Sequence, residues 1–191
     1  MVRLVLASAS PRRAELLRAA GIDFDVIAAS LDESVLPGER PQAHARRLAQ
    51  AKALHVVERV GGRNPILAAD TIVAIEGQIL GKPADEADAR RMLRTLSGRT
   101  HEVITAVCLA SGPREPLVEH AVTTVEFAPL SEAEIAWYAV SGEGADKAGA
   151  YAIQGLASRF AVRISGSYTN VVGLPVALVY HLCKRAGLLI S

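Results

Sequence analysis

The sequence predicts an α/β fold with a mixed central β-sheet flanked by helices. Apolar, β-branched runs alternate with helical patterns along the chain, which is the order expected when helices connect the strands of one sheet. Segments 100–110 and 117–127 are two long β-branched runs joined by a short turn, and such adjacent strands indicate a mixed sheet. With 191 residues, half of them hydrophobic, the chain is expected to form a single domain, 1–191, or two small lobes around a sizeable core.

Short apolar runs bounded by glycine, proline or polar residues predict the strands. The run RLVLA opens the chain, and PILAADTIVAI is apolar nearly throughout. The turn Glu76-Gly77-Gln78 predicts a hairpin from this second run into Ile79 and Leu80. In chain order, the predicted strands are 3–7, 24–29, 65–75, 79–80, 100–110, 117–127 and 162–165.

Helix boundaries are marked by capping residues and by prolines. Pro11 and Pro41 suit the first position of a helix, because proline has a fixed φ and no amide hydrogen to leave unpaired. Ser131 with Glu134 three residues later forms a capping-box pattern. Helix ends are expected at Gly21, Gly61-Gly62 and Ser97-Gly98. The predicted helices are 11–20, 41–60, 85–96, a helix starting at 131, and 175–186, with loops at 30–41 and 141–150.

Composition excludes several classes of protein. A net charge of +1 argues against a nucleic-acid-binding stripe and a polybasic membrane patch. No apolar run reaches the roughly 18 residues of a membrane span, and the first residues lack a signal-peptide pattern. The expectation is a cytoplasmic protein without nucleic-acid or membrane partners. Cys108 and Cys183 have no metal-ligand spacing and are expected to be buried, reduced thiols.

The stretch LASASPRRAELL places hydroxyls and two arginines where a strand meets a helix. Ser10 is the expected N-cap of the helix that begins at Pro11. A helix N-terminus presents free amide groups and the positive end of the dipole, which attract anions. Ser8, Arg12 and Arg13 add donors that suit phosphate oxygens. The alternative is an ordinary helix cap beside two solvated arginines.

Asp70 is a carboxylate inside an otherwise apolar strand, on the same face as Ala68 and Ile72. An isolated buried carboxylate is costly, so it requires a metal ion, a lysine or a bound ligand as partner. A strand that ends at Ala69, with Asp70 in a turn, is the alternative. Lys52 lies at the edge of the apolar stripe of helix 41–60, where it either extends outward to solvent or points at an acidic group.

Other polar residues are individually ambiguous. Lys82 lies in the short loop GKP, Glu33 in the polar segment LDESV, and Gln154 in the apolar stretch AYAIQGLA. Solvated turn residues, or a buried turn-forming amide for Gln154, explain each of them equally well. No P-loop, Ser-His-Asp or metal-binding histidine pattern is present. Cations, hydroxyls and one buried acid together indicate a phosphate-ester site with a divalent metal.

Six sequence blocks resemble the signature blocks of the Maf family, the septum-formation-inhibitor-like nucleotide pyrophosphatases. In chain order, the blocks are SASPRR, AADTIV, GKP, LSGRTHEVITAV, DKAGAYAIQG and ISGSYTNVVGLP. The resemblance covers residues 4 to about 180 and implies an inosine-triphosphatase-like fold of two lobes around a deep cleft, often as a homodimer. It also implies hydrolysis of a nucleoside triphosphate to the monophosphate and pyrophosphate with Mg²⁺ or Mn²⁺.

The resemblance also implies roles for particular residues. Asp70 matches the proposed general base and metal-site carboxylate, and Glu33 a second acidic position of the metal site. The positions that match triphosphate-binding residues are Ser8, Arg12, Arg13, Lys52 and Lys82. The positions that match residues associated with the choice of base are Arg12, Thr71 and Gln154.

DTIV together with AYAIQG and GSY resembles the branch of the family that acts on dTTP and UTP. The alternatives are the sister branch, which prefers 7-methyl-GTP, and a nucleotide-binding regulator of septum formation without turnover. Removal of aberrant nucleotides and cell-division arrest are the associated cellular roles. Ala9 stands where glycine is frequent in SASPRR, which is a mild departure.

Overall fold

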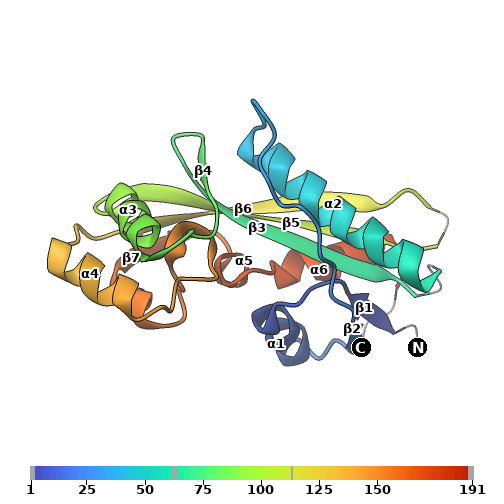
Figure 1. The fold of residues 1–191 in the computed structure, drawn as a ribbon. Coiled ribbons are helices and arrows are strands. Elements are labelled where there is room, and N and C mark those ends of the chain that lie inside the picture. The colour runs from blue at the N-terminus through green and yellow to red at the C-terminus, as the bar shows by residue number, and fades with distance from the viewer. Residues whose placement is uncertain (1–2, 62–63, 113, 189–191) are drawn as a thin grey trace.

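A computed structural model describes residues 3–61, 64–112 and 114–188. Their strands form one seven-stranded sheet in the order β2-β1-β3-β5-β6-β7, with β4 paired to β3 (Figure 1). The strands are β1 Leu4–Leu6, β2 Phe24–Val26, β3 Ile66–Ile75, β4 Gln78–Leu80, β5 Thr100–Ala110, β6 Leu117–Phe127 and β7 Ala161–Ser165. β1 pairs in parallel with β2 and β3, and all other pairs are antiparallel. The predicted mixed α/β fold is confirmed.

The helices gather at two ends of this sheet (Figure 1). α2 lies along one face of the sheet, whereas α1 and α6 lie on the other side, and α3 and α4 group at the far end. The helices are α1 Pro11–Ala19, α2 Pro41–Val60, α3 Glu86–Leu96, α4 Glu132–Val140, α5 Tyr168–Val172 and α6 Val176–Arg185. None of these helices is both long and apolar enough to cross a lipid bilayer.

β3 connects the hydrophobic cores because alternate residues of a strand face opposite sides of the sheet. On one face, Ala68 and Ile72 pack under α2. On the other face, Leu67 and Ala69 belong to the core with α1 and α6, whereas Val73 and Ile75 belong to the core with α3 and α4. Thr71 therefore lies between these two cores, at the centre of the sheet.

Most predicted element boundaries agree with the structure to within about two residues. β2 is shorter than predicted and ends at Val26, because its partner β1 ends at Leu6; the amide of Ile27 makes the last bond to that carbonyl. The capping box of Ser131 and Glu134 is present. Ser10 occupies the predicted N-cap, but its side chain makes no capping hydrogen bond.

Three helical segments were not predicted: α5 and the 3₁₀ turns Ala148–Ala150 and Leu156–Arg159. α5 contains β-branched residues, and Ser167 initiates it by accepting a hydrogen bond from the amide of Asn170. Gly61 ends α2 with a φ of 72°, as its predicted role requires. Gly62 and Pro113, which belong to a predicted helix end and a predicted turn, lie outside the described residues.

Candidate active site

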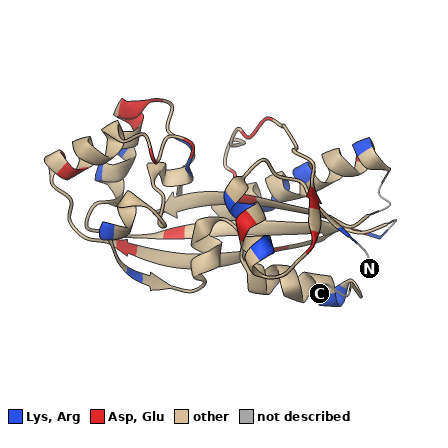
Figure 2. Cartoon of the chain, turned by 90° about the horizontal axis from the view of Figure 1, so that it is seen from below, with Lys and Arg blue, Asp and Glu red and all other residues tan. Residues whose placement is uncertain are grey.

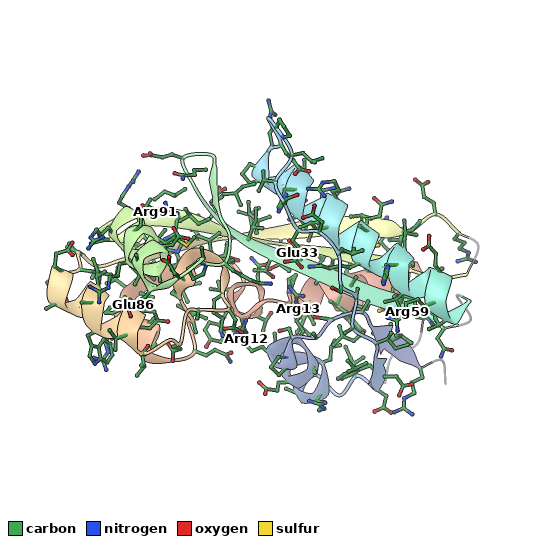
Figure 3. All side chains as sticks on the ribbon, viewed as in Figure 1. Arg12, Arg13, Glu33, Arg59, Glu86 and Arg91 are labelled. Atoms are coloured by element: carbon green, nitrogen blue, oxygen red, sulfur yellow. The ribbon has the colours of Figure 1, made fainter. Side chains whose placement is uncertain are left out.

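A cavity of about 770 Å³ is lined by the start of α1, by α2 and β3, and by residues 146–154. Every candidate residue lines this cavity: Ser8, Arg12, Arg13, Glu33, Lys52, Asp70, Thr71, Lys82 and Gln154. In Figure 3, Arg12, Arg13 and Glu33 lie near the middle of the molecule, whereas Arg59 and Glu86 lie toward its ends. The structure thus brings together residues that are up to 146 positions apart in sequence, from Ser8 to Gln154.

Lys52 and Asp70 form a buried ion pair at the base of the site. Nζ of Lys52 donates to Oδ1 of Asp70 at 2.6 Å, and both residues are at most 7% exposed. Asp70 lies within β3, so the alternative of a strand ending at Ala69 is wrong. Lys52 turns inward from α2 to the sheet, so the alternative of a solvated lysine is wrong as well.

Glu33 extends this pair to the other side of the cavity. Its Oε1 lies 2.6 Å from Nζ of Lys52, and its Oε2 accepts a hydrogen bond from Nζ of Lys82 at 3.3 Å. Burial raises the pKa of Glu33, but the hydrogen bonds and charges of the two lysines outweigh burial and hold it below the usual value. The side chains of Asp70, Lys52, Glu33 and Lys82 therefore form a connected chain of contacts in which carboxylates alternate with amino groups.

Arg13 is bound by three segments of the protein. Its Nε donates to the carbonyl of Gly173 at 2.8 Å, and its two terminal nitrogens donate to the hydroxyls of Ser8 and Thr71 at 3.1 Å each. Burial lowers the pKa of Arg13, and the charge of Asp70 opposes that effect. The alternative of a solvated arginine is wrong for Arg13. Its contacts join α1 to β3 and to the end of α5, and its predicted contact with phosphate stays a prediction.

Gln154 comes from the wall of the cavity on the α3 and α4 side. That wall is held close to the sheet at Gly149, where φ is 70° and an added Cβ would lie 2.9 Å from a methyl group of Val73. Nearby, the hydroxyl of Tyr151 hydrogen-bonds to Nε2 of His101 at 2.9 Å. Gln154 itself is exposed, so its side chain remains accessible to a bound molecule.

Five further polar residues line the cavity that sequence reasoning did not single out: Ser30, His44, Asp146, Lys147 and Tyr151. Lys147 is paired with Asp146, and its side chain is only 16% exposed. Asp146, Lys147 and Tyr151 all lie in the block DKAGAYAIQG, so that block was the signal for them. His44 precedes Lys52 by two helical turns on α2, and this spacing was its signal.

Asp70 and Glu33 supply an oxygen donor set of the kind that Mg²⁺ and Mn²⁺ accept. Both carboxylates converge on the same atom, Nζ of Lys52, at 2.6 Å. Among the described residues, no group of three or more His, Cys, Asp or Glu side chains forms a complete metal site. The residues therefore fit a cation whose remaining ligands are oxygens of a bound molecule, which is how Mg²⁺ commonly binds.

The fold and the cavity define an α/β protein with a central, cation-rich cleft. The chain belongs to the Maf family, because the family model described as "Maf-like protein" matches residues 3–186. The "dTTP/UTP pyrophosphatase" of Geobacter sulfurreducens is 53% identical over 188 residues, covering 98% of each chain. That of Syntrophomonas wolfei is 54% identical over 183 residues, covering 95% of this chain and 96% of the relative.

A solved structure shares part of this fold. The HAM1 protein from Coxiella burnetii superposes with a TM-score of 0.50 at 22% sequence identity, covering 68% of this chain and 75% of that chain. At this level of identity, the match supports the mixed α/β architecture alone.

Proposed function

We propose that this protein hydrolyses dTTP and UTP to the nucleoside monophosphate and pyrophosphate. Relatives more than half identical over nearly their whole length carry the name of this activity. The observation that carries the proposal in the structure is the buried Lys52–Asp70 pair at the base of a cationic cavity. It places one carboxylate beside the cations that a triphosphate needs.

The triphosphate lies across the cavity, with its oxygens bound by Lys52, Lys82 and the start of α1. Charged donors at these positions neutralise the negative charge that builds on the leaving pyrophosphate. Ser8 is 6% exposed, and its hydroxyl accepts from the amide of Ser10 and from Arg13. The hydroxyl is thereby oriented toward the cavity at the point where the helix begins.

Asp70 accepts the proton of the attacking water. Its Oδ1 is bound to Lys52, and within the described residues no hydrogen bond reaches Oδ2. The water oxygen attacks the α-phosphorus, its proton passes to Asp70, and the bond between the α-phosphorus and the bridging oxygen breaks, so that pyrophosphate leaves. Asp70 and Glu33 would hold Mg²⁺ or Mn²⁺, which would supply further charge neutralisation of the phosphates.

Base selection is assigned to Arg12, Thr71 and Gln154. The three residues come from α1, β3 and the opposite wall, and they line the same cavity. Thr71 is fixed by its contacts with Arg13 and with the hydroxyl of Thr105 at 2.9 Å. The homodimer, the cytoplasmic location and the roles in nucleotide cleaning or cell division stay predictions.

A hydrolysis panel tests the proposed function. Purified protein is incubated with Mg²⁺ or Mn²⁺ and with dTTP, UTP, CTP, GTP, ATP or 7-methyl-GTP, and the nucleotide products and pyrophosphate are measured separately. Monophosphate plus pyrophosphate from dTTP and UTP is expected. Preference for 7-methyl-GTP would place the protein with the sister branch. Diphosphate plus orthophosphate, or tight binding without turnover, would overturn the mechanism.

A further inference from the structure

Glu39 is a buried carboxylate just outside the cavity, at the end of the loop that carries Glu33. Its side chain is only 8% exposed. Arg47 of α2 binds it with two nitrogens, at 2.6 Å to Oε1 and 2.8 Å to Oε2. Nδ1 of His44 lies 2.8 Å from Oε2, and the amide of Leu36 donates to the same oxygen at 3.1 Å. Glu39 thus joins the loop to α2.

Arg47 holds this loop at a second point. Its Nη2 also donates to the carbonyl of Ser34 at 3.0 Å, and Ser34 directly follows Glu33 in the chain. One guanidinium therefore binds both the residue next to Glu33 and the carboxylate of Glu39. The hydrogen bonds of Arg47 lower the pKa of Glu39 to about 2, against the effect of burial, so Glu39 is charged near neutral pH.

The position of Glu33 depends on this anchor. Residues 27–40 contain no helix or strand. Apart from the bond of the Glu39 carboxylate to the amide of Leu36, the loop's own hydrogen bonds are a turn at Asp32 and the bond from the amide of Glu39 to the carbonyl of Leu36. A segment with so few internal bonds samples many conformations unless side chains fix it. Arg47, which holds the loop, and Lys52, which Glu33 contacts, both belong to α2. Their separation is therefore fixed by the helix.

We propose that Glu39, acting through Arg47, is a positioning residue for the reaction, because it holds Glu33 between Lys52 and Lys82. The inference rests on the proposed function. Without the anchor, Glu33 leaves Lys52, and the ammonium that adjoins the reacting carboxylate of Asp70 loses its second partner. The main effect is then on kcat rather than on KM, because most of the groups that bind substrate remain in place.

The test is a double-mutant cycle of Glu39→Gln and Glu33→Gln, with pyrophosphate release from dTTP and thermal unfolding measured for each variant. Loss of a residue that orients a site group typically costs about 10–100-fold in activity, so Glu39→Gln is expected to lower kcat by about that factor. In the Glu33→Gln background, Glu39→Gln is expected to cause no further loss. Destabilisation alone does not produce this dependence on Glu33.

Glu132 supplies the matched control, because Arg94 binds it with two nitrogens at 2.8 and 2.7 Å on the surface, away from the cavity. Glu132→Gln is expected to leave kcat unchanged. If Glu39→Gln does not fold, Arg47→Lys tests the same link, since one ammonium does not reproduce a forked contact.

The outcomes separate the two proposals. Wild-type protein that releases no pyrophosphate from dTTP or UTP would overturn the proposed function. The role of Glu39 alone would be overturned by either of two results with an active wild-type protein. The first is an unchanged kcat in Glu39→Gln. The second is an equal reduction of kcat by Glu39→Gln in the wild-type and the Glu33→Gln backgrounds.

Discussion

At the scale of single residues, the site is defined by the charged side chains that form ion pairs inside the fold. Removing one partner of a buried ion pair typically costs about 3–5 kcal/mol, because the other charge is left uncompensated. Lys52 has two carboxylate partners, Asp70 and Glu33, each 2.6 Å from its Nζ. Loss of one of them therefore still leaves its charge paired. The same arrangement leaves Oδ2 of Asp70 without a hydrogen bond among the described residues, so this oxygen is available to accept a proton, as a general base must.

Asp70→Asn is expected to remove most turnover and to leave the fold intact. The amide does not accept the proton of the attacking water, and general-base catalysis contributes about 10²–10⁴-fold. Lys52 still has Glu33 as a partner in this variant, so it does not become an unpaired buried charge. Asp25→Asn, at an exposed position on β2, is the control. Near-wild-type release of pyrophosphate by Asp70→Asn would contradict the assignment.

Arg13→Lys is expected to lower the free energy of unfolding by about 1–3 kcal/mol, because a lysine does not satisfy the carbonyl and the two hydroxyls that Arg13 binds. The neighbouring Arg12→Lys is the matched control and is expected to change it by less than about 0.5 kcal/mol. Urea denaturation of both variants makes the comparison. If Arg13→Lys and Arg12→Lys destabilise the protein equally, the hydrogen bonds of Arg13 to Ser8, Thr71 and Gly173 do not stabilise the fold.

At the scale of secondary-structure elements, α2 decides how closely the site can be assembled. Ala45, Ala49 and Ala53 face the sheet and are fully buried. Because these side chains are small, the helix axis lies close to β3, and the extended side chain of Lys52 reaches Asp70. Larger residues on this face would increase the separation between the helix and the sheet.

Ala49→Leu is expected to lower the free energy of unfolding by about 1–3 kcal/mol, the usual cost of overpacking a core. It is also expected to lower the rate of pyrophosphate release, because displacement of α2 lengthens the contact between Lys52 and Asp70. Ala43→Leu introduces the same side chain on the exposed face of α2 and serves as the control. A stable, fully active Ala49→Leu variant would contradict this account of the helix.

At the scale of the whole molecule, α1, α2, β3, α5 and residues 146–154 all contribute to the cavity. Charged residues of both signs are interspersed over the loops and helices in the view of Figure 2, in keeping with a net charge of +1. Around the α3 and α4 end, His101 packs against the rings of Phe127 and Tyr151 at centroid distances of 5.0 and 5.4 Å. This aromatic core supports the wall that carries Gln154.

The stability of the molecule is expected to fall in mild acid because of His101. Burial lowers its pKa to about 4, whereas an unfolded histidine titrates near 6.5. Between these values the unfolded chain binds more protons than the folded one, so stability rises with pH. The contribution is fully present above pH 6.5 and decreases by about 3 kcal/mol as the pH falls to about 4.

Urea denaturation of wild type and of His101→Gln between pH 4 and pH 7 measures this contribution. Glutamine retains a polar partner for the hydroxyl of Tyr151 but does not titrate. The unfolding free energy of wild type minus that of His101→Gln is expected to decrease as the pH falls through this range. A constant difference would show that His101 does not contribute to the acid sensitivity.

Local sequence patterns were sufficient for most elements. Pro41 and Gly61 set the ends of α2, and the apolar runs set β3, β5 and β6. Local signals failed at α5, whose β-branched residues are typical of strands, and at the end of β2, which the length of β1 decides. Both β1 and β2 are confirmed as strands, but only their pairing fixes where the second one stops.

The sequence by itself determined the candidate residues, the family blocks and the mixed sheet, because these depend on residue type, order and local periodicity. Only the tertiary structure decided that Lys52 points inward, that Arg13 is held by Ser8, Thr71 and Gly173, and that Glu39 anchors the loop of Glu33. Each of these features depends on the distance in space between side chains that are far apart in the sequence. A charged side chain exchanges water for a partner only where folding brings that partner within hydrogen-bond distance.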